Sequence, residues 1–121
     1  MTEAEFMEHI RALVTDLGLY AYHAHDSRRS WGPGYPDLTI AGPNGILFRE
    51  AKTDAGQLSH NQKLWGYRLA ASGGNFSVWR PADLRPRTAG QPGPLHRQLL
   101  WLAGRGPVRL CIAITAAARS R

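Results

Sequence analysis

One segment, Gly34–Lys52 (GYPDLTIAGPNGILFREAK), restricts the fold most, because its pattern predicts two short strands joined by a tight turn. The turn Gly42–Gly45 separates an apolar run at Leu38–Ala41 from a second run at Ile46–Lys52. Clusters of Gly, Pro and Asn between apolar runs are typical of hairpin turns. The two arms have similar lengths, so the hairpin is expected to bring Asp37, directly before the first strand, close to the end of the second.

The second strand combines apolar and charged residues in an ordered way. Alternation with a period of two places four residues on one face, apolar at the start and charged at the end: Ile46, Phe48, Glu50 and Lys52. This pattern predicts a strand that begins in the core and ends at an open cleft.

The charged groups at the end of the hairpin favour a metal site. Two nearby carboxylates, Asp37 and Glu50, repel each other and are costly to keep ionised unless a cation lies between them. Oxygen ligands favour a hard ion such as Mg²⁺ or Mn²⁺. Lys52 beside that ion could stabilise the charge that grows on a phosphate during hydrolysis. The cluster therefore predicts phosphodiester hydrolysis.

The remaining pattern up to residue 80 completes an α-β-β-β-α-β order. Thr2 and Glu5 form a capping-box pattern before apolar residues at helical spacing, and Gly18 ends that helix. Ser59 is the expected N-cap of the next helix, which Gly73 ends. The predicted elements are a helix over 2–17, strands over 19–25, 38–41 and 46–52, a helix over 59–72, a strand over 75–80, a short helix over 96–104 and a short strand over 107–115.

The charge is distributed unevenly. Residues 1–83 hold eight Lys and Arg and all nine Asp and Glu, whereas residues 84–121 hold seven Arg and no acid. We therefore expect a core over 1–83 and a basic extension over 84–121, packed on the core or continuous with it. Arginine without counter-charge suits phosphate contacts, and a solvated tail is the alternative explanation. The candidate DNA contacts in this extension are Arg85, Arg87 and Arg97.

Pro36-Asp37 followed by Glu50-Ala51-Lys52 resembles the PD-(D/E)xK signature of metal-dependent nucleases. The stretches GYPDL and LSHNQ, at residues 34–38 and 58–62, narrow the resemblance to the VRR-NUC branch in its small, stand-alone, phage-like form. The resemblance extends over about residues 2–83 and implies an α/β fold of the restriction-endonuclease type, with a central mixed sheet flanked by helices. It also implies Mg²⁺ or Mn²⁺ held by Asp37, Glu50 and the Ala51 carbonyl, with Lys52 in catalysis and Gln62 supporting the site.

Several further residues have two explanations. Gln62 fits a capping box with Ser59 but also lies on the inward stripe of its helix. Glu3 lies on the apolar stripe of the first helix and could approach the metal, whereas the helix dipole alone also favours an acid there. Arg28 and Arg29, in the loop before the motif, are candidate phosphate contacts.

We therefore expect a metal-dependent DNA endonuclease with a preference for branched DNA, similar to Holliday-junction resolvases. The alternatives are a less selective nicking, flap or end nuclease, and a catalytically silent DNA-binding protein. A homodimer is expected from the resemblance and from large aromatic residues that one small core does not readily hide: Trp65, Tyr67, Trp79 and Trp101. The chain lacks a secretory signal pattern and a run of about 18 apolar residues, so we expect no membrane contact and a location in the bacterial cytoplasm, including that of a phage host.

Overall fold

The computed structural model describes residues 1–24 and 31–105. Its elements follow in the order α1 (Glu3–Asp16), β1 (Tyr20–His23), β2 (Leu38–Gly42), β3 (Gly45–Ala51), α2 (His60–Ala71), β4 (Asn75–Trp79), the 3-10 helix η2 (Pro81–Leu84) and α3 (Pro94–Leu102). The predicted α-β-β-β-α-β order is confirmed. The helix predicted over 96–104 is α3, which begins two residues earlier. The strand predicted over 107–115, and Arg28 and Arg29, lie outside the described residues.

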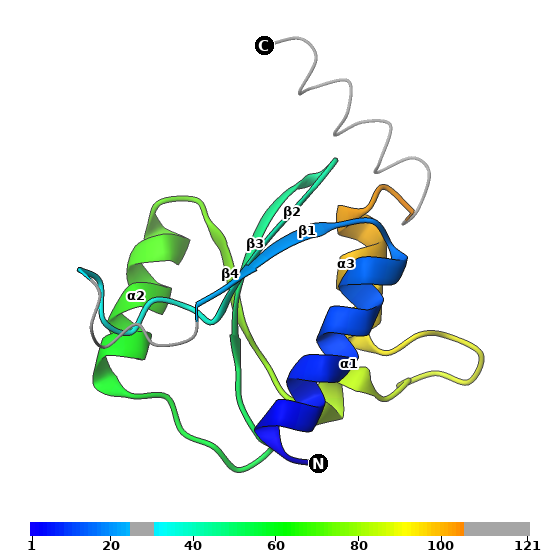
Figure 1. Cartoon of the computed structure of the whole chain (residues 1–121), viewed down its shortest axis with the longest axis horizontal. Helices are drawn as coiled ribbons and strands as arrows, with labels where there is room; N and C mark the ends of the chain where they lie inside the picture. The colour runs from blue at the N-terminus through cyan, green and yellow to red at the C-terminus, as the bar shows by residue number, and fades with distance from the viewer. Residues whose placement is uncertain (25–30, 106–121) are drawn as a thin grey trace, which may run out of the picture.

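The four strands form one mixed sheet in the order β1-β2-β3-β4. Strands β1, β2 and β3 pair antiparallel, whereas β4 runs parallel to β3. In Figure 1, α2 lies on one side of the sheet, and α1 and α3 lie together on the other side. This is the flanked mixed sheet that the sequence resemblance implied.

The main core lies between the sheet, α1 and α3. Its buried residues come from α1, from the segment before β1, from β2, β3 and β4, and from α3: Phe6, Ile10, Val14, Leu19, Leu38, Ile40, Leu47, Ala51, Trp79, Leu95, Leu99 and Leu102. Three of the four leucines of α3, Leu95, Leu99 and Leu102, are fully buried. Residues 94–102 are therefore part of the same core as the hairpin, and the division into two regions at residue 83 stays a prediction.

Local sequence signals account for the ends of α1. The side chain of Thr2 accepts a hydrogen bond from the amide of Glu5 at 3.1 Å, as an N-cap does. Gly18 has a φ of +68°, a left-handed conformation that suits glycine and lets the chain leave the helix toward β1.

One prediction about β3 was wrong. Ile46, at the start of the strand, is 50% exposed, whereas Glu50, near its end, is 2% exposed. The hairpin pairs from Gly42 opposite Gly45, and its turn extends beyond α2 in Figure 1. At the other end of the strand Gln62 of α2 contacts Glu50, so burial increases toward the charged residues instead of decreasing.

Arg49 forms a buried polar network that sequence reasoning missed. Its side chain is 2% exposed and lies on the core face of the sheet, 5.2 Å from the centre of the Trp79 ring. It donates to the Asn75 carbonyl oxygen at 2.6 Å and to Gln98 Oε1 at 3.0 Å, and Trp79 Nε1 donates to the same Gln98 oxygen at 2.9 Å. Burial lowers the pKa of Arg49 to about 10. The network ties β3 and β4 to α3 through neutral acceptors.

Candidate functional site

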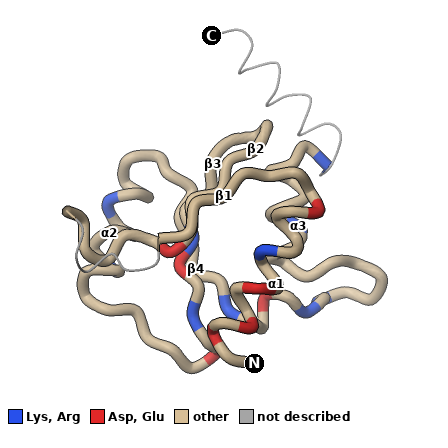
Figure 2. Tube along the Cα trace, viewed as in Figure 1, with Lys and Arg blue, Asp and Glu red and all other residues tan. Residues whose placement is uncertain are grey.

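The predicted carboxylates meet where β2 begins and β3 ends. Asp37 directly precedes β2, and its Oδ2 accepts a hydrogen bond from the amide of Ala51 at 3.0 Å. Glu50 lies beside Ala51 on β3 and points to the α2 side of the sheet. Lys52 follows, with its Nζ 3.7 Å from Glu50 Oε2. Acidic and basic positions meet beside β4 in Figure 2, so the hairpin brings together the three charged groups that the sequence singled out.

Gln62 satisfies both explanations that the sequence left open. Its Oε1 accepts from the amide of Ser59 at 2.8 Å, and its own amide donates to Ser59 Oγ at 3.2 Å, which is a capping box. At the same time the side-chain Nε2 of Gln62, as distinct from its backbone amide, donates to Glu50 Oε2 at 3.3 Å. The first turn of α2 therefore holds the Glu50 carboxyl group in place from the side opposite the core.

Glu50 is in an unusual electrostatic environment. Burial first, and then the nearby carboxyl group of Asp37, raise the pKa of Glu50 to about 8, whereas Lys52 acts in the opposite direction. Glu50 Oε1 is buried and has no hydrogen-bond partner. A buried carboxyl oxygen without a partner is costly, and a cation would satisfy it.

The chemistry of this pair fits a hard divalent ion. Mg²⁺ commonly takes one or two carboxylates, keeps several waters and uses substrate phosphate oxygens for the rest of its shell. Asp37 and Glu50 supply two carboxylates, and the hydrogen bond from Ala51 places its backbone beside the first. Among the described residues no group of three or more His, Cys, Asp and Glu could hold a metal by itself. Glu3 is exposed in the first turn of α1 and does not complete such a group.

The raised pKa of Glu50 leads to a prediction about stability. Between its ordinary pKa of 4.5 and the folded value of about 8, the folded chain binds more protons than the unfolded chain, so its stability falls as the pH rises through this window. Glu50→Gln removes this loss. In EDTA, we expect the free energy of unfolding of Glu50→Gln relative to the parent to grow from near zero at about pH 5 to about 1–3 kcal/mol at about pH 8.

Thermal or urea denaturation at the two pH values measures this difference. Glu8→Gln is the matched control, because Glu8 is exposed in its ion pair with Arg11. If Glu50→Gln changes the free energy of unfolding by the same amount at both pH values, Glu50 does not hold a proton in the folded chain.

The segment after Lys52 is fixed by Arg80. Its Nη1 donates to the carbonyl oxygens of Thr53 and Gly56, at 2.6 and 2.7 Å. This clamp holds the turn that follows β3 against the start of η2. The backbone that presents Lys52 is therefore tied to the end of β4.

The basic residues predicted to contact DNA lie on the surface. Arg85 and Arg87 are exposed and pair with Asp54 at 3.5 Å and with Asp83 at 3.6 Å. Arg97 is exposed on α3. These arginines are not part of the carboxylate cluster, and their role in DNA binding stays a proposal.

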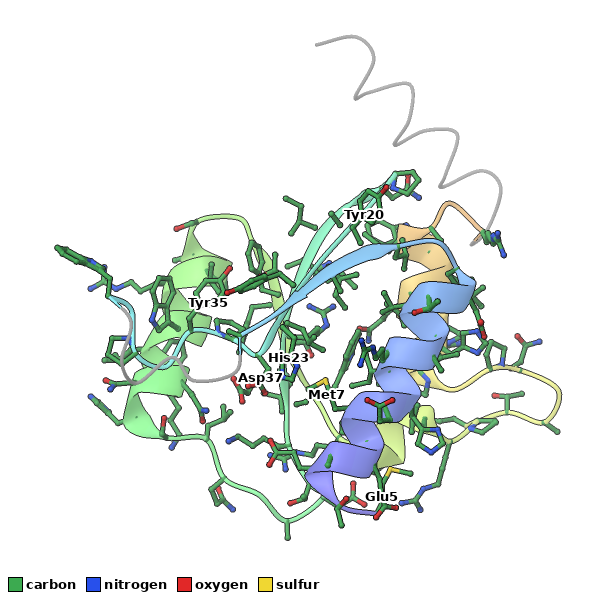
Figure 3. The ribbon with its side chains drawn as sticks, in the orientation of Figure 1. Glu5, Met7, Tyr20, His23, Tyr35 and Asp37 are labelled. Atoms are coloured by element: carbon green, nitrogen blue, oxygen red, sulfur yellow. The ribbon has the colours of Figure 1, made fainter. Side chains whose placement is uncertain are left out.

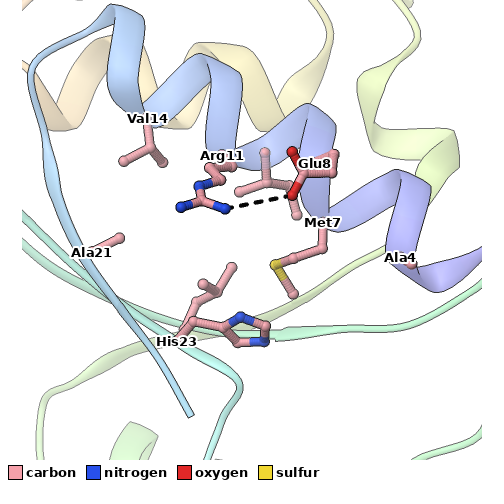
Figure 4. A pocket seen from close by; sticks show the side chains of 9 residues that line it. Ala4, Met7, Glu8, Arg11, Val14, Ala21 and His23 are labelled. Carbon is pink, nitrogen blue, oxygen red and sulfur yellow. Dashed lines mark ion pairs between the residues drawn. The ribbon is translucent and has the colours of Figure 1, made fainter. Parts of the chain in front are cut away.

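A separate cavity of about 430 Å³ lies on the other side of the sheet, between α1 and β1. Figure 4 shows Met7 and Val14 over it, the Glu8–Arg11 ion pair at its rim and His23 at one end. Figure 3 labels His23 and Asp37 close together in the middle of the molecule. Neither Asp37 nor Glu50 lines the cavity, and Glu50 instead contacts Gln62 of α2.

A comparison with solved structures identifies the architecture. A "VRR_NUC domain protein" matches with probability 1.00, a TM-score of 0.53 and 25% sequence identity, over 66% of this chain and 78% of that chain. The chain has a VRR-NUC nuclease fold. No family profile and no curated protein sequence matches it. In this VRR-NUC fold, the Asp37–Glu50–Lys52 cluster occupies one end of the mixed sheet. No helix in the described part of the chain is long and apolar enough to cross a membrane.

Proposed function

We propose that this protein is a Mg²⁺- or Mn²⁺-dependent nuclease that hydrolyses phosphodiester bonds in DNA. The observation that supports this most is the buried Glu50 carboxyl group, with one oxygen unpartnered and with Asp37, Lys52 and Gln62 around it. The VRR-NUC nuclease fold of the chain supports the same reaction class.

Each residue of the cluster has a proposed role. Asp37 and Glu50 would hold the metal, together with the backbone carbonyl of Ala51. A bound divalent ion polarises a phosphate oxygen and lowers the pKa of bound water. Gln62 would keep Glu50 oriented through its hydrogen bond of 3.3 Å. Lys52 would donate to the phosphate as negative charge grows on it.

Metal binding at this site would be linked to the protonation state of Glu50. A carboxylate must be ionised to bind a metal, so binding is linked to loss of the proton. Because the pKa of Glu50 is about 8, the metal must displace a proton at neutral pH. We expect metal affinity to increase with pH up to about 8 for this reason.

Preference for branched DNA and assembly as a homodimer are further parts of the proposal. Two active sites related by a two-fold axis suit a substrate with paired strands to cut. The aromatic residues give this less support than the sequence suggested, because Trp79 is buried in the core and Trp65 and Trp101 are half-buried. Only Tyr67 of these four is exposed, so sedimentation of the full chain is needed to determine its assembly state.

Four-way, flap, nicked and linear DNAs, each incubated with Mg²⁺, Mn²⁺ or EDTA, test the reaction and its selectivity. We expect cleavage with either ion and none in EDTA, with the branched substrates cut faster than linear duplex. Equal rates on all four DNAs would favour the less selective nicking, flap or end nuclease. Binding without cleavage under every metal condition would favour a silent DNA-binding protein.

A further inference from the structure

The loop Trp31–Pro36, which leads directly into Asp37, is held tightly against α2. The ring of Tyr35 meets Trp65 edge-on, with centroids 5.1 Å apart, and its hydroxyl lies 2.9 Å from Thr39 Oγ1. A Cβ at Gly32 would lie 2.7 Å from the Trp65 ring, and one at Gly34 would lie 2.6 Å from Asn61. Glycine is therefore required at both positions for this close approach.

Trp31, the first residue of this loop, is exposed. Its exposed fraction is 103%, the highest among the exposed large hydrophobic residues of the described chain. Five residues separate it from Asp37, which makes six Cα–Cα steps, so the two Cα atoms lie at most about 22 Å apart. A single DNA strand in the candidate site could therefore reach Trp31 within several nucleotides. An exposed tryptophan ring near a candidate nuclease site is suited to stack on an unpaired base of a nucleic acid.

The face of α2 that meets this loop carries a cation. Arg68 is exposed and lies one helical turn beyond Trp65, on the face that also carries Asn61. Residues 31–36 and 60–71 contain no Asp or Glu. Figure 2 shows no acidic position on α2. A positive surface next to an exposed aromatic ring is the combination that binds single-stranded nucleic acid, because the cations follow the phosphates while the ring stacks on a base.

We propose that Trp31 stacks on an unpaired base of the DNA substrate, with Arg68 of α2 contacting an adjacent phosphate. This inference rests on the proposed function, because it assumes that DNA enters the site at Asp37. It narrows the substrate to DNA with a single-stranded arm or a splayed end near the scissile bond. A fully paired duplex keeps its bases stacked within the helix and offers Trp31 none.

The test compares binding of a labelled oligothymidine and a hairpin duplex of equal length to the full chain in EDTA, by fluorescence anisotropy. We expect Trp31→Ala to weaken oligothymidine binding by about 5- to 100-fold, the range for loss of one base–aromatic stack. Duplex binding should change by less than about twofold. Trp31→Phe should retain most of the affinity, because a smaller ring still stacks.

Tyr20→Ala is the matched control, since Tyr20 is an exposed aromatic residue, 84% accessible, on β1. It should leave both affinities unchanged. The inference is overturned if Trp31→Ala binds oligothymidine as the parent does, if it weakens both DNAs equally, or if the parent does not bind oligothymidine.

The same measurements separate this inference from the proposed function, because they need no metal and no cleavage. A chain that never cuts DNA but loses single-strand affinity in Trp31→Ala would contradict the nuclease alone. A chain that cuts DNA with Mg²⁺ but binds oligothymidine without using Trp31 would contradict the stacking residue alone.

Discussion

Asp37→Asn and Glu50→Gln should each abolish metal-dependent DNA cleavage while leaving DNA affinity nearly unchanged. Each substitution keeps the volume of the side chain but replaces an anionic oxygen ligand with an amide. Both carboxylates are needed, because the described residues offer the metal no third acid. Lys52→Ala should lower turnover by about 10²-fold or more, the scale for loss of one donor to the transition state.

Initial cleavage rates in saturating Mg²⁺, with binding measured separately in EDTA, test these variants. Asp16→Asn and Glu8→Gln make the same chemical changes at exposed positions on α1 and should cut like the parent. Normal cleavage by Asp37→Asn would remove the basis for the proposed nuclease. Loss of binding together with cleavage would instead indicate that the fold had been damaged.

Removal of α3 should unfold the protein. A chain that ends after residue 83 lacks Leu95, Leu99 and Leu102, all fully buried. Deleting a single buried leucine side chain to alanine typically costs about 2–5 kcal/mol, and domains of this size are stable by only about 5–15 kcal/mol. The truncation also removes Gln98, the acceptor for Arg49 and Trp79. A buried guanidinium would then have lost a hydrogen-bond partner.

Circular dichroism and thermal denaturation measure this effect, and a chain ending after residue 105 is the matched control. That control keeps α3 and every described contact, so we expect it to melt cooperatively. If the chain ending after residue 83 also melted cooperatively at a similar temperature, α3 would be an attachment to the core instead of part of it.

Much of the fold followed from short-range signals in the sequence. The Gly-Pro-Asn-Gly turn and the alternation of the two strands correctly predicted the hairpin. The caps at Thr2 and Ser59 correctly predicted the starts of two helices. These signals work because they depend on neighbours within a few residues.

Long-range packing could not be predicted in the same way. The alternation that placed Glu50 on one face also placed Arg49 on the opposite face, beside Leu47 and Ala51, and this was the available signal for a buried cation. Its partner Gln98 is 49 residues away, and nothing local to α3 indicated the pairing. The reversed burial along β3 was missed for the same reason, because the contact between Gln62 of α2 and Glu50 depends on tertiary packing.

Arg49 and Glu50 are adjacent in one strand, and each is buried on a different side of it. If β3 paired in a register shifted by one residue, the two side chains would exchange faces of the sheet. The acid would then face the Gln98 oxygen, which already accepts hydrogen bonds, and the guanidinium would take the place of Glu50 beside Lys52 and Gln62. Both arrangements are destabilising, so hairpins in the wrong register should not persist during folding. The correct register of β3 would then depend on Arg49 and Glu50, which lie on the core face and on the α2 face of the sheet.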